Sequence, residues 1–390
     1  MLYSLIDERD LMPNFFRALA LTLLLPLLLT TAQAQPQSSA EAGADYRRRL
    51  QAYNAAWQAY DAEATAYWAL VTDKRRLRLA KRGRGEAVSL EDYVLAQPPV
   101  YAGPPRPVDP STPDKRPPPP RHDRKYVPTI PEMLASARTY FQFAPDRPAS
   151  ELDFKRAYAR ALAAEGIDVD LAVRVYAFET GGLGTYDVQS GLLNAKPGAK
   201  PLSPAIGYNQ LLITYTLHLL ADQGDEFLRA VTRLPASGAR QRKAAALRRM
   251  IAFSRTVPNK WHHLDKLGET RQGWGVQTLL LDSDVGPLLQ ARKLSASVRY
   301  ARQRGYRGRL TAAELQMLNL MGDGSGFDVI TMPQAMRAQV PTSNFFQRRG
   351  YERNAVVRRH NTVAQLLAIT DTRMDAASRQ PGARDLAASF

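Results

Sequence analysis

The chain has 390 residues, and 45% of them are hydrophobic, which is enough for one large domain with extensions or for two domains around a sizeable core. Lys and Arg total 53 against 37 Asp and Glu, so the formal net charge is +16, and a surplus of this size indicates an anionic partner such as nucleic acid, acidic lipid or an acidic polymer. No cysteine is present, which excludes disulfides, thiol chemistry and a lipid-bearing cysteine.

Residues 1–34 have the features of a signal peptide. The apolar stretch Ala18–Thr31 is about as long as a signal-peptide core, and it ends in the small-x-small pattern "AQA" that signal peptidase cuts. The residues before Met12 are acidic, whereas a start at Met12 leaves Arg17 as the expected positive charge, so we expect translation to begin at Met12 and not at Met1. The alternative interpretation of this stretch is an uncleaved membrane anchor.

Export would place the protein in the periplasm, and this location argues against nucleic acid as the anionic partner. The abundant anionic polymers of the periplasm are the cell wall and the membrane surfaces. We therefore expect a periplasmic protein that contacts one of these.

Segment 44–95 is predicted to be helical. Apolar and mainly aromatic residues recur there with alternating spacings of four and three, which is a heptad pattern. Two interpretations remain open: a coiled coil that joins two copies of the chain as a homodimer, or a helix that packs this stripe on its own globular domain or in a short helical hairpin. The stripe consists of Tyr46, Leu50, Tyr53, Trp57, Tyr60, Ala64, Tyr67 and Val71.

A run of seven cations, Lys74–Arg84, lies toward the end of this segment. Cations near a helix C-terminus oppose the negative end of the helix dipole. The run would either contact an anionic membrane or wall polymer or form a solvated face of the helix.

Residues 97–131 contain thirteen prolines, a composition that favours polyproline II over any packed element. We interpret them as a semi-rigid linker or as a strap over the surface. The globular domain is then expected at 132–375, with a polar tail at 376–390. On this division, the segment before Pro98 is expected to be dispensable for the domain's chemistry.

The globular domain is predicted to be mainly α-helical, because apolar residues recur at helical spacing and strand signals are scarce. Turns are expected at Gly181–Ser203, Gly322–Gly326 and Pro341–Asn344. The predicted helices are Glu151–Glu165, Val169–Glu179, Leu211–Gln223, Glu226–Thr232, Gln241–Val257, Val285–Tyr306, Ala312–Asn319 and Asn361–Thr370.

Glu179 lies in the last turn of one predicted helix, and two glycines follow it in "FETGG". Asp168 or Asp170 can cap the start of this helix, and Gly181 and Gly182 supply its left-handed stop. The helix dipole disfavours an anion at this end, and partial burial also raises a carboxyl pKa. A raised pKa suits a general acid that works near neutral pH.

The motif E-T-G-G-x-G-x-Y-D at Glu179–Asp187 and the motif S-x-A-x-G-x-x-Q-L-L at Ser203–Leu212 together resemble the soluble lytic transglycosylases of the lysozyme-like superfamily. Their signature is E-S, a loop, and then S-x-A-x-G-L-M-Q with an apolar pair. The resemblance implies a lysozyme-like helical domain, a long substrate groove and Glu179 as the catalytic acid and base. Tyr208-Asn209 replaces the family's Leu-Met, and the interval between the two motifs is longer than usual, which leaves the substrate preference open.

Two further segments extend the resemblance. "MLNLMGDGSG" is similar to the family's A-Y-N-A-G-P-G region, with Asn319 on the asparagine, and "VPTSNFFQRRGY" is similar to its T-x-x-Y-V stretch, with Phe345 or Phe346 as the aromatic that closes the cleft. The loop "GTYDVQSG" is expected to form one lip of that cleft. The implied substrate-binding residues are Thr180, Tyr186, Gln189, Ser203, Gly207, Tyr208, Gln210, Asn319 and Phe346.

The predicted function is that of an exported enzyme that cleaves the β-1,4 bond between MurNAc and GlcNAc in the glycan strands of peptidoglycan, with a single catalytic Glu and 1,6-anhydro products. The alternatives are a non-catalytic wall-binding or scaffold protein with the same groove, and a hydrolytic glycosidase of the lysozyme or chitinase type, for which Asp187 is the nearest second carboxylate in sequence. No cofactor is expected, and no metal, because His262-His263 and "GDGSGFD" lack the ligand spacings of zinc and calcium sites.

Overall fold

The computed structural model describes residues 39–111 and 126–390, and over these residues the protein is mainly helical, which confirms the mainly α class. The predicted signal peptide, the two candidate start sites and the centre of the predicted linker lie outside the described residues. Within the described ranges, no helix combines the length and the apolar character needed to cross a bilayer.

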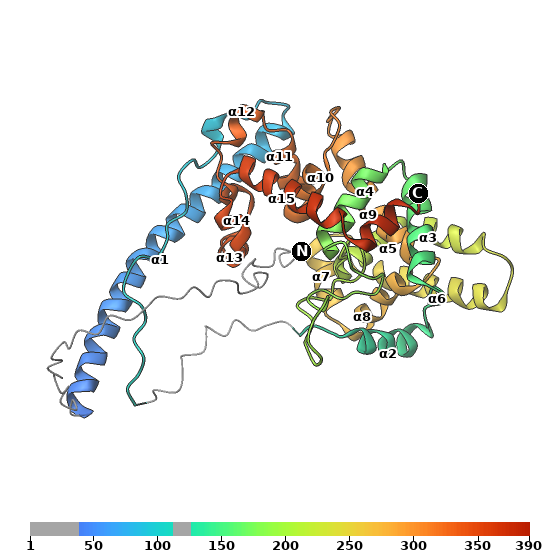
Figure 1. Cartoon of the computed structure of the whole chain (residues 1–390), viewed down its shortest axis with the longest axis horizontal. Coiled ribbons are helices and arrows are strands. Elements are labelled where there is room, and N and C mark those ends of the chain that lie inside the picture. The colour runs from blue at the N-terminus through green and yellow to red at the C-terminus, as the bar shows by residue number, and fades with distance from the viewer. Residues whose placement is uncertain (1–38, 112–125) are drawn as a thin grey trace, which may run out of the picture.

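Sixteen α-helices and three short 3₁₀ helices follow one another along the described chain. In chain order they are α1 (Ser39–Gly83), η2 (Leu90–Asp92), α2 (Ile130–Phe141), α3 (Glu151–Ala164), α4 (Val169–Thr180), α5 (Ile213–Thr232), α6 (Gly238–Ser254), α7 (Trp261–Gly268), α8 (Arg271–Gln277), η3 (Thr278–Leu281), α9 (Gly286–Gln303), α10 (Ala312–Met321), α11 (Asp323–Ile330), α12 (Gln334–Arg337), η4 (Thr342–Phe345), α13 (Arg348–Arg353), α14 (Ala355–Arg359), α15 (Val363–Ser378) and α16 (Pro381–Ala387) (Figure 1).

Two hydrophobic clusters meet at α9. Cluster 1 buries side chains of α3, α4, α9, α10, α11, α15 and α16, and cluster 2 buries side chains of α2, α5, α6, α7, α8, η3 and the start of α9. Leu289 on α9 belongs to cluster 2, whereas Leu294 belongs to cluster 1. Helix α9 therefore lies between two cores, and polar side chains that it carries, such as Lys293 and Ser297, are buried as well.

A third hydrophobic cluster joins α1 to the C-terminal part of the chain. Trp68 and Val71 of α1 are buried there together with Val340, Phe346 and Tyr351. Of the two interpretations of the aromatic stripe, the described contacts therefore show packing on the chain's own globular part for the second half of α1. A homodimer through the helix stays a prediction.

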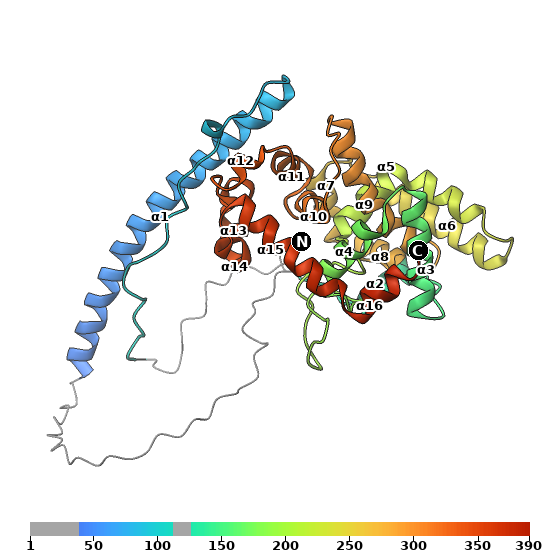
Figure 2. The same ribbon diagram turned by 45° about the horizontal axis from the view of Figure 1, so that its top comes forward.

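The first half of α1 extends away from the helical domain, and the chain after η2 runs back along it (Figures 1 and 2). The Tyr101 ring on this returning segment contacts three aromatic rings of the stripe, with centroid distances of 6.0 Å to Tyr53, 5.3 Å to Trp57 and 5.6 Å to Tyr60. Part of the predicted linker is therefore an ordered strap over the aromatic stripe.

The basic run at the end of α1 is directed largely toward the protein. The Arg78 guanidinium donates to Asp328 Oδ2 at 2.7 Å, and both side chains are almost completely buried. Arg82 and the Tyr93 hydroxyl donate to the other oxygen of Asp328, and Arg75 donates to the carbonyl of Phe346 at 2.8 Å. These cations hold α1 on the domain, a role that neither interpretation of the run foresaw.

Three expectations about chain organisation need correction. Residues 376–390 are not a polar tail, because α15 continues to Ser378 and α16 buries Ala383 and Leu386 in cluster 1. The glycine-rich segment at Gly322–Gly326 is not only a turn, because α11 begins at Asp323. The segment before Pro98 also contributes to the fold, since removing it would expose cluster 3 to water. In each case a few buried contacts outweigh the local composition.

We predict that Asp328→Asn destabilises the protein by about 3–5 kcal/mol, because it leaves the buried guanidinium of Arg78 without a charge partner. The matched control is Asp73→Asn, which breaks the exposed Arg76–Asp73 pair on α1, the helix that carries Arg78, and should cost less than about 1 kcal/mol. Urea denaturation followed by tryptophan fluorescence measures both values. Equal stability of the two variants would contradict the proposed role of Asp328 in holding α1.

Candidate functional site

Helix α4 places Glu179 in its last turn because both ends of the helix are specified. At its start, Asp168 Oδ1 accepts the amide hydrogen of Leu171 at 2.9 Å. At its end, Gly181 adopts the left-handed conformation with φ of 62°, and Gly182 follows with φ of 70°. A Cβ atom at Gly182 would lie 2.1 Å from the carbonyl oxygen of Ala377 on α15, so a glycine is required where the chain passes α15.

The Glu179 carboxyl group is partly buried and has a specific hydrogen-bond partner. Gln316 Nε2, on α10, donates to Glu179 Oε1 at 2.7 Å. Burial raises the pKa of Glu179 above its ordinary value, and the hydrogen bond from Gln316 opposes part of this effect. Gln316 is itself buried, and its Oε1 atom has no hydrogen-bond partner within the described structure.

A buried lysine shares this environment. The Lys293 ammonium group on α9 lies 4.2 Å from the centroid of the Tyr215 ring on α5. Burial lowers the pKa of Lys293 to about 8, and the carboxylates of Asp323 and Glu179 oppose this effect. An acid and a base whose pKa values are moved toward each other by burial are typical of functional sites.

Hydrogen bonds between α9, α10 and α11 complete the cluster. Ser297 lies one turn beyond Lys293, and its hydroxyl group is 3.3 Å from both Asn319 Oδ1 and Asp323 Oδ1. Asn319 lies nearly one turn beyond Gln316 on α10. Five helices therefore contribute polar side chains to one cluster, which consists of Glu179, Tyr215, Lys293, Ser297, Gln316, Asn319 and Asp323.

Sequence reasoning identified Glu179 and Asn319 of this cluster and missed its other five members, Tyr215, Lys293, Ser297, Gln316 and Asp323. One signal was present, because Gln316 and Asn319 are three residues apart and so share a face of a largely apolar helix. Lys293 and Ser297, four residues apart on α9, form a similar polar row. Neither pattern indicates which helix it faces, so the meeting of the two rows required the tertiary structure.

The loop after α4 is closed at its base by short antiparallel bridges, which pair Gln189 with Ile206 and Ile206 with Leu211. The Gln189 side chain is buried and donates to the carbonyl oxygens of Pro128 at 2.8 Å and Ser203 at 3.2 Å. Gln189 therefore holds the base of the loop to the segment before α2. The tip of the loop remains exposed.

Three residues of the G-x-x-Q segment, Gly207, Tyr208 and Gln210, have a structural explanation. Gly207 has φ of 82°, and a Cβ atom there would lie 1.8 Å from Gln290 Nε2 on α9. Gln210 also adopts a left-handed backbone, with φ of 44°, and its side chain donates to the carbonyl of Gly207 at 2.9 Å. The Tyr208 ring is fully buried in cluster 1, and its hydroxyl group donates to Glu151.

Three other predicted binding residues also form internal contacts. The Thr180 hydroxyl is buried and donates to the carbonyl of Tyr176 at 2.7 Å, and Ser203 Oγ accepts the amide hydrogen of Ala205 at 3.3 Å. The resemblance implied that Phe346 closes the cleft beside Glu179. The structure instead buries Phe346 against α1 in cluster 3. Its apolar ring is more stable in that third core than at an open cleft.

Tyr186 is a predicted binding residue whose side chain reaches the surface. Its ring stacks on Phe154 with a centroid distance of 4.9 Å, and Arg147 donates to its hydroxyl at 3.0 Å. Arg147 also forms an ion pair with Asp187 at 3.4 Å. Asp187 accepts a hydrogen bond from Thr185 at 2.7 Å, which is the local contact expected of a turn aspartate.

Comparison with models of protein families, with curated proteins and with solved structures yields no match for this chain. The structural environment of Glu179 is therefore the basis for a functional proposal. In the described part of the chain, no group of three or more His, Asp or Glu residues has the arrangement of a metal site.

We predict that Lys293→Met raises the pKa of Glu179 further, because a nearby cation stabilises the ionised carboxylate and methionine removes that charge at similar length. Carboxyl carbon shifts of labelled glutamate, followed by NMR across pH, measure the pKa directly. The matched control is Lys155→Met, since Lys155 is equally buried but pairs with Asp385 at 3.6 Å. Equal titration of Glu179 in both variants would show that Lys293 does not interact with it.

Proposed function

We propose that this protein is an exported peptidoglycan-cleaving enzyme of the lytic transglycosylase type, with a lysozyme-like domain and with Glu179 as its catalytic acid and base. The observation that carries the proposal is the partly buried Glu179 at the end of α4, whose pKa burial raises and whose Oε1 is held by Gln316. The resemblance of the E-T-G-G and G-x-x-Q segments to that family supports the same assignment.

The geometry explains how one carboxyl group can act as the acid. A raised pKa means that Glu179 keeps its proton to a higher pH than an ordinary glutamate does, and a protonated carboxyl group can protonate the oxygen of a glycosidic bond as that bond breaks. Because Gln316 donates to Oε1, the proton is favoured on Oε2. Gln316 thus acts as a positioning residue, and the ionised carboxylate formed after the first step can take a proton back in the second.

The other carboxylates near the loop are already engaged. Asp187 is paired with Arg147 and Thr185. Glu151 accepts hydrogen bonds from the Tyr208 hydroxyl and from the Tyr186 amide, the latter at 3.1 Å. With neither group free to act as a nucleophile, the second role is assigned to the substrate, as the resemblance implies: the N-acetyl group assists departure and the C6 hydroxyl closes on C1.

Charge and the proposed location support a cell-wall substrate. The formal net charge of +16 suits a protein that works against an anionic polymer, and Trp57 and Tyr126 are large aromatic side chains that remain exposed. The periplasm is the compartment in which such an enzyme would meet peptidoglycan.

A non-catalytic wall-binding protein is the second candidate. The observation that favours it is the internal use of Thr180, Gln189, Tyr208 and Gln210, which leaves few polar side chains beside Glu179 to hold a reacting sugar. The two candidates make opposite predictions for substitution of Glu179.

We predict that Glu179→Gln lowers the cleavage of purified sacculi by about two orders of magnitude or more, because the amide keeps the shape of the side chain but cannot transfer the proton. Release of soluble fragments and loss of turbidity measure this activity. Asp187→Asn is the matched control and should retain activity. Full activity in Glu179→Gln would exclude the proposed mechanism, and binding without cleavage by the unmodified protein would favour the scaffold.

Stability provides the test that Glu179→Gln is folded. Since burial raises the pKa of Glu179 in the folded state, the unfolded chain loses its proton first as the pH rises above the ordinary value of 4.5. The unmodified protein therefore loses stability between that pH and the raised pKa, whereas the Gln variant does not. The variant should match the unmodified protein in acid and exceed it in stability at neutral pH.

We predict that the products carry 1,6-anhydro ends and not new reducing ends, because the other carboxylates near Glu179 already have partners: Asp187 and Glu151 as described above, and Asp323 with the Ser297 hydroxyl. Retaining and inverting hydrolases instead place a second carboxylate about 5–5.5 Å or about 6.5–9.5 Å from the acid. Mass spectrometry of digested sacculi distinguishes the products by one water molecule per cleaved bond. Products that all retain this water, together with loss of activity in Asp187→Asn, would indicate a two-carboxylate hydrolase.

A further inference from the structure

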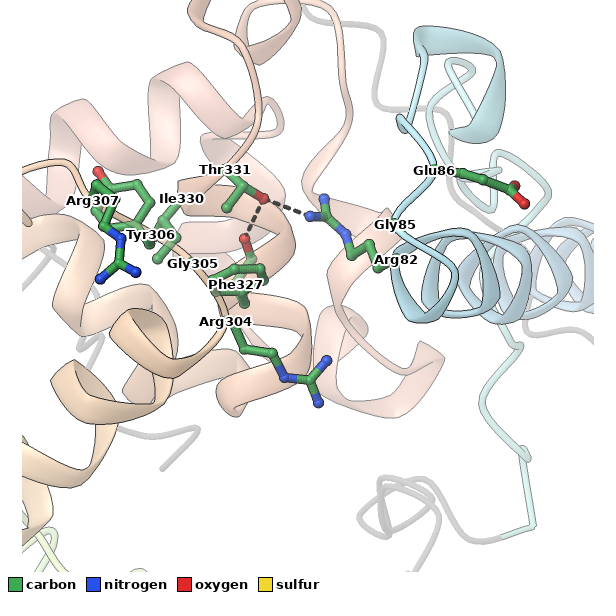
Figure 3. Close-up of a pocket in the computed structure, with 10 residues that line it drawn as sticks. All are labelled: Arg82, Gly85, Glu86, Arg304, Gly305, Tyr306, Arg307, Phe327, Ile330 and Thr331. Carbon is green, nitrogen blue, oxygen red and sulfur yellow. Dashed lines mark hydrogen bonds between the residues drawn. The ribbon is translucent and has the colours of Figure 1, made fainter.

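A cavity of about 450 Å³ lies between the end of α1, the chain after α9 and helix α11 (Figure 3). Arg82 contributes from α1, Arg304, Tyr306 and Arg307 from the chain after α9, and Phe327 from α11. Its volume is within the range of ordinary small-molecule sites. Glu179 does not line this cavity, so a ligand bound here would occupy a different site from the proposed site of bond cleavage.

The lining carries a surplus of positive charge. The residues that line the cavity include three arginines and one acidic residue, Glu86, whose carboxylate is bonded to Arg84 at 2.9 Å and points away from the arginines in Figure 3. Arg82 shares the single carboxylate of Asp328 with Arg78, so two cations there are balanced by one anion. Arg82 Nε is buried and has no hydrogen-bond partner in the described structure.

Intramolecular contacts position the cations. Arg302 donates to the carbonyl oxygens of Tyr306 at 3.0 Å and Gly308 at 2.7 Å, which fixes the course of the chain after α9. The Arg304 guanidinium lies 5.3 Å from the Tyr300 ring centroid, and that of Arg82 lies 5.7 Å from the Phe327 ring centroid. Arg82 and the backbone after α9 are therefore in place before a ligand arrives, which lowers the entropic cost of binding.

We propose that this pocket binds the phosphate group of a phosphorylated ligand. A guanidinium presents a planar fork of donors that matches phosphate oxygens, and the exposed Arg304 and Arg307 offer two such forks at the cavity. Arg82, whose Nη atoms are bonded to Thr331 and Asp328, adds positive charge. Phe327 and Tyr306 offer an apolar wall for the body of the ligand. Because the cations come from both α1 and the chain after α9, a bound phosphate strengthens the attachment of α1.

The test is isothermal titration of the full chain with inorganic pyrophosphate. Binding should weaken by about tenfold or more in Arg304→Gln/Arg307→Gln, which removes two charge-assisted contacts but no residue of the Asp328 network. The matched control is Arg106→Gln/Arg160→Gln, which removes the same charge from exposed positions outside the pocket. Absence of binding, or an equal loss in both double variants, would overturn the proposal.

A second measurement identifies the source of the phosphate. Vesicles of phosphatidylcholine with phosphatidic acid present a lipid phosphate monoester, and vesicles of phosphatidylcholine alone serve as the blank. Vesicle binding that pyrophosphate displaces and that Arg304→Gln/Arg307→Gln weakens indicates a lipid headgroup. Pyrophosphate binding without specific vesicle binding indicates a soluble phosphate ester. Glu179→Gln should bind pyrophosphate normally, so loss of cleavage and loss of phosphate binding can be told apart.

Discussion

The hydrogen bond from Gln316 to Glu179 is the interaction on which the proposed site depends. A carboxyl group enclosed by helices costs free energy unless it is neutral or hydrogen-bonded. Here burial favours the neutral form, while the Gln316 amide and the Lys293 ammonium favour the ionised form. This balance between opposing effects allows one group both to give up a proton and to take it back, which is what acid and base catalysis by a single residue requires.

A second buried carboxylate, that of Asp328, organises the opposite end of the molecule. It accepts hydrogen bonds from Arg78, Arg82 and Tyr93, and so joins the N-terminal helix to a part of the chain more than two hundred residues later. The same contacts place Arg82 at the edge of the arginine-lined cavity. The stability of the α1 attachment and the charge of the cavity therefore have a common origin, and a ligand in the cavity would affect both.

The segments that resemble lytic transglycosylases act in this structure chiefly as determinants of backbone shape. Gly182 permits the passage beside α15, and Gly207 permits the contact with Gln290 on α9. Gln189 and Gln210 bond to main-chain carbonyls and close the loop that begins beside Glu179. These residues fix the backbone that holds the Glu179 carboxyl group. The sequence resemblance at these positions therefore concerns the backbone conformation around the site and not contacts with a substrate.

The sequence by itself determined the mainly helical class, the positions of α3, α4, α6, α9 and α10 within a few residues, and Glu179 as the candidate acid, because helical periodicity, caps and glycine stops are local properties of the chain. Only the tertiary structure decided that Gln316 and Lys293 lie near Glu179 and that α16 is part of the core. It also decided that Phe346 packs on α1, where Arg75 of the basic run donates to its carbonyl oxygen. These depend on which helix faces meet, and a polar row on one helix contains no information about its partner. The predictions of a turn at 322–326 and of a polar tail at 376–390 were wrong for the same reason. Both segments are helical and pack on residues distant in sequence, which local composition does not reveal.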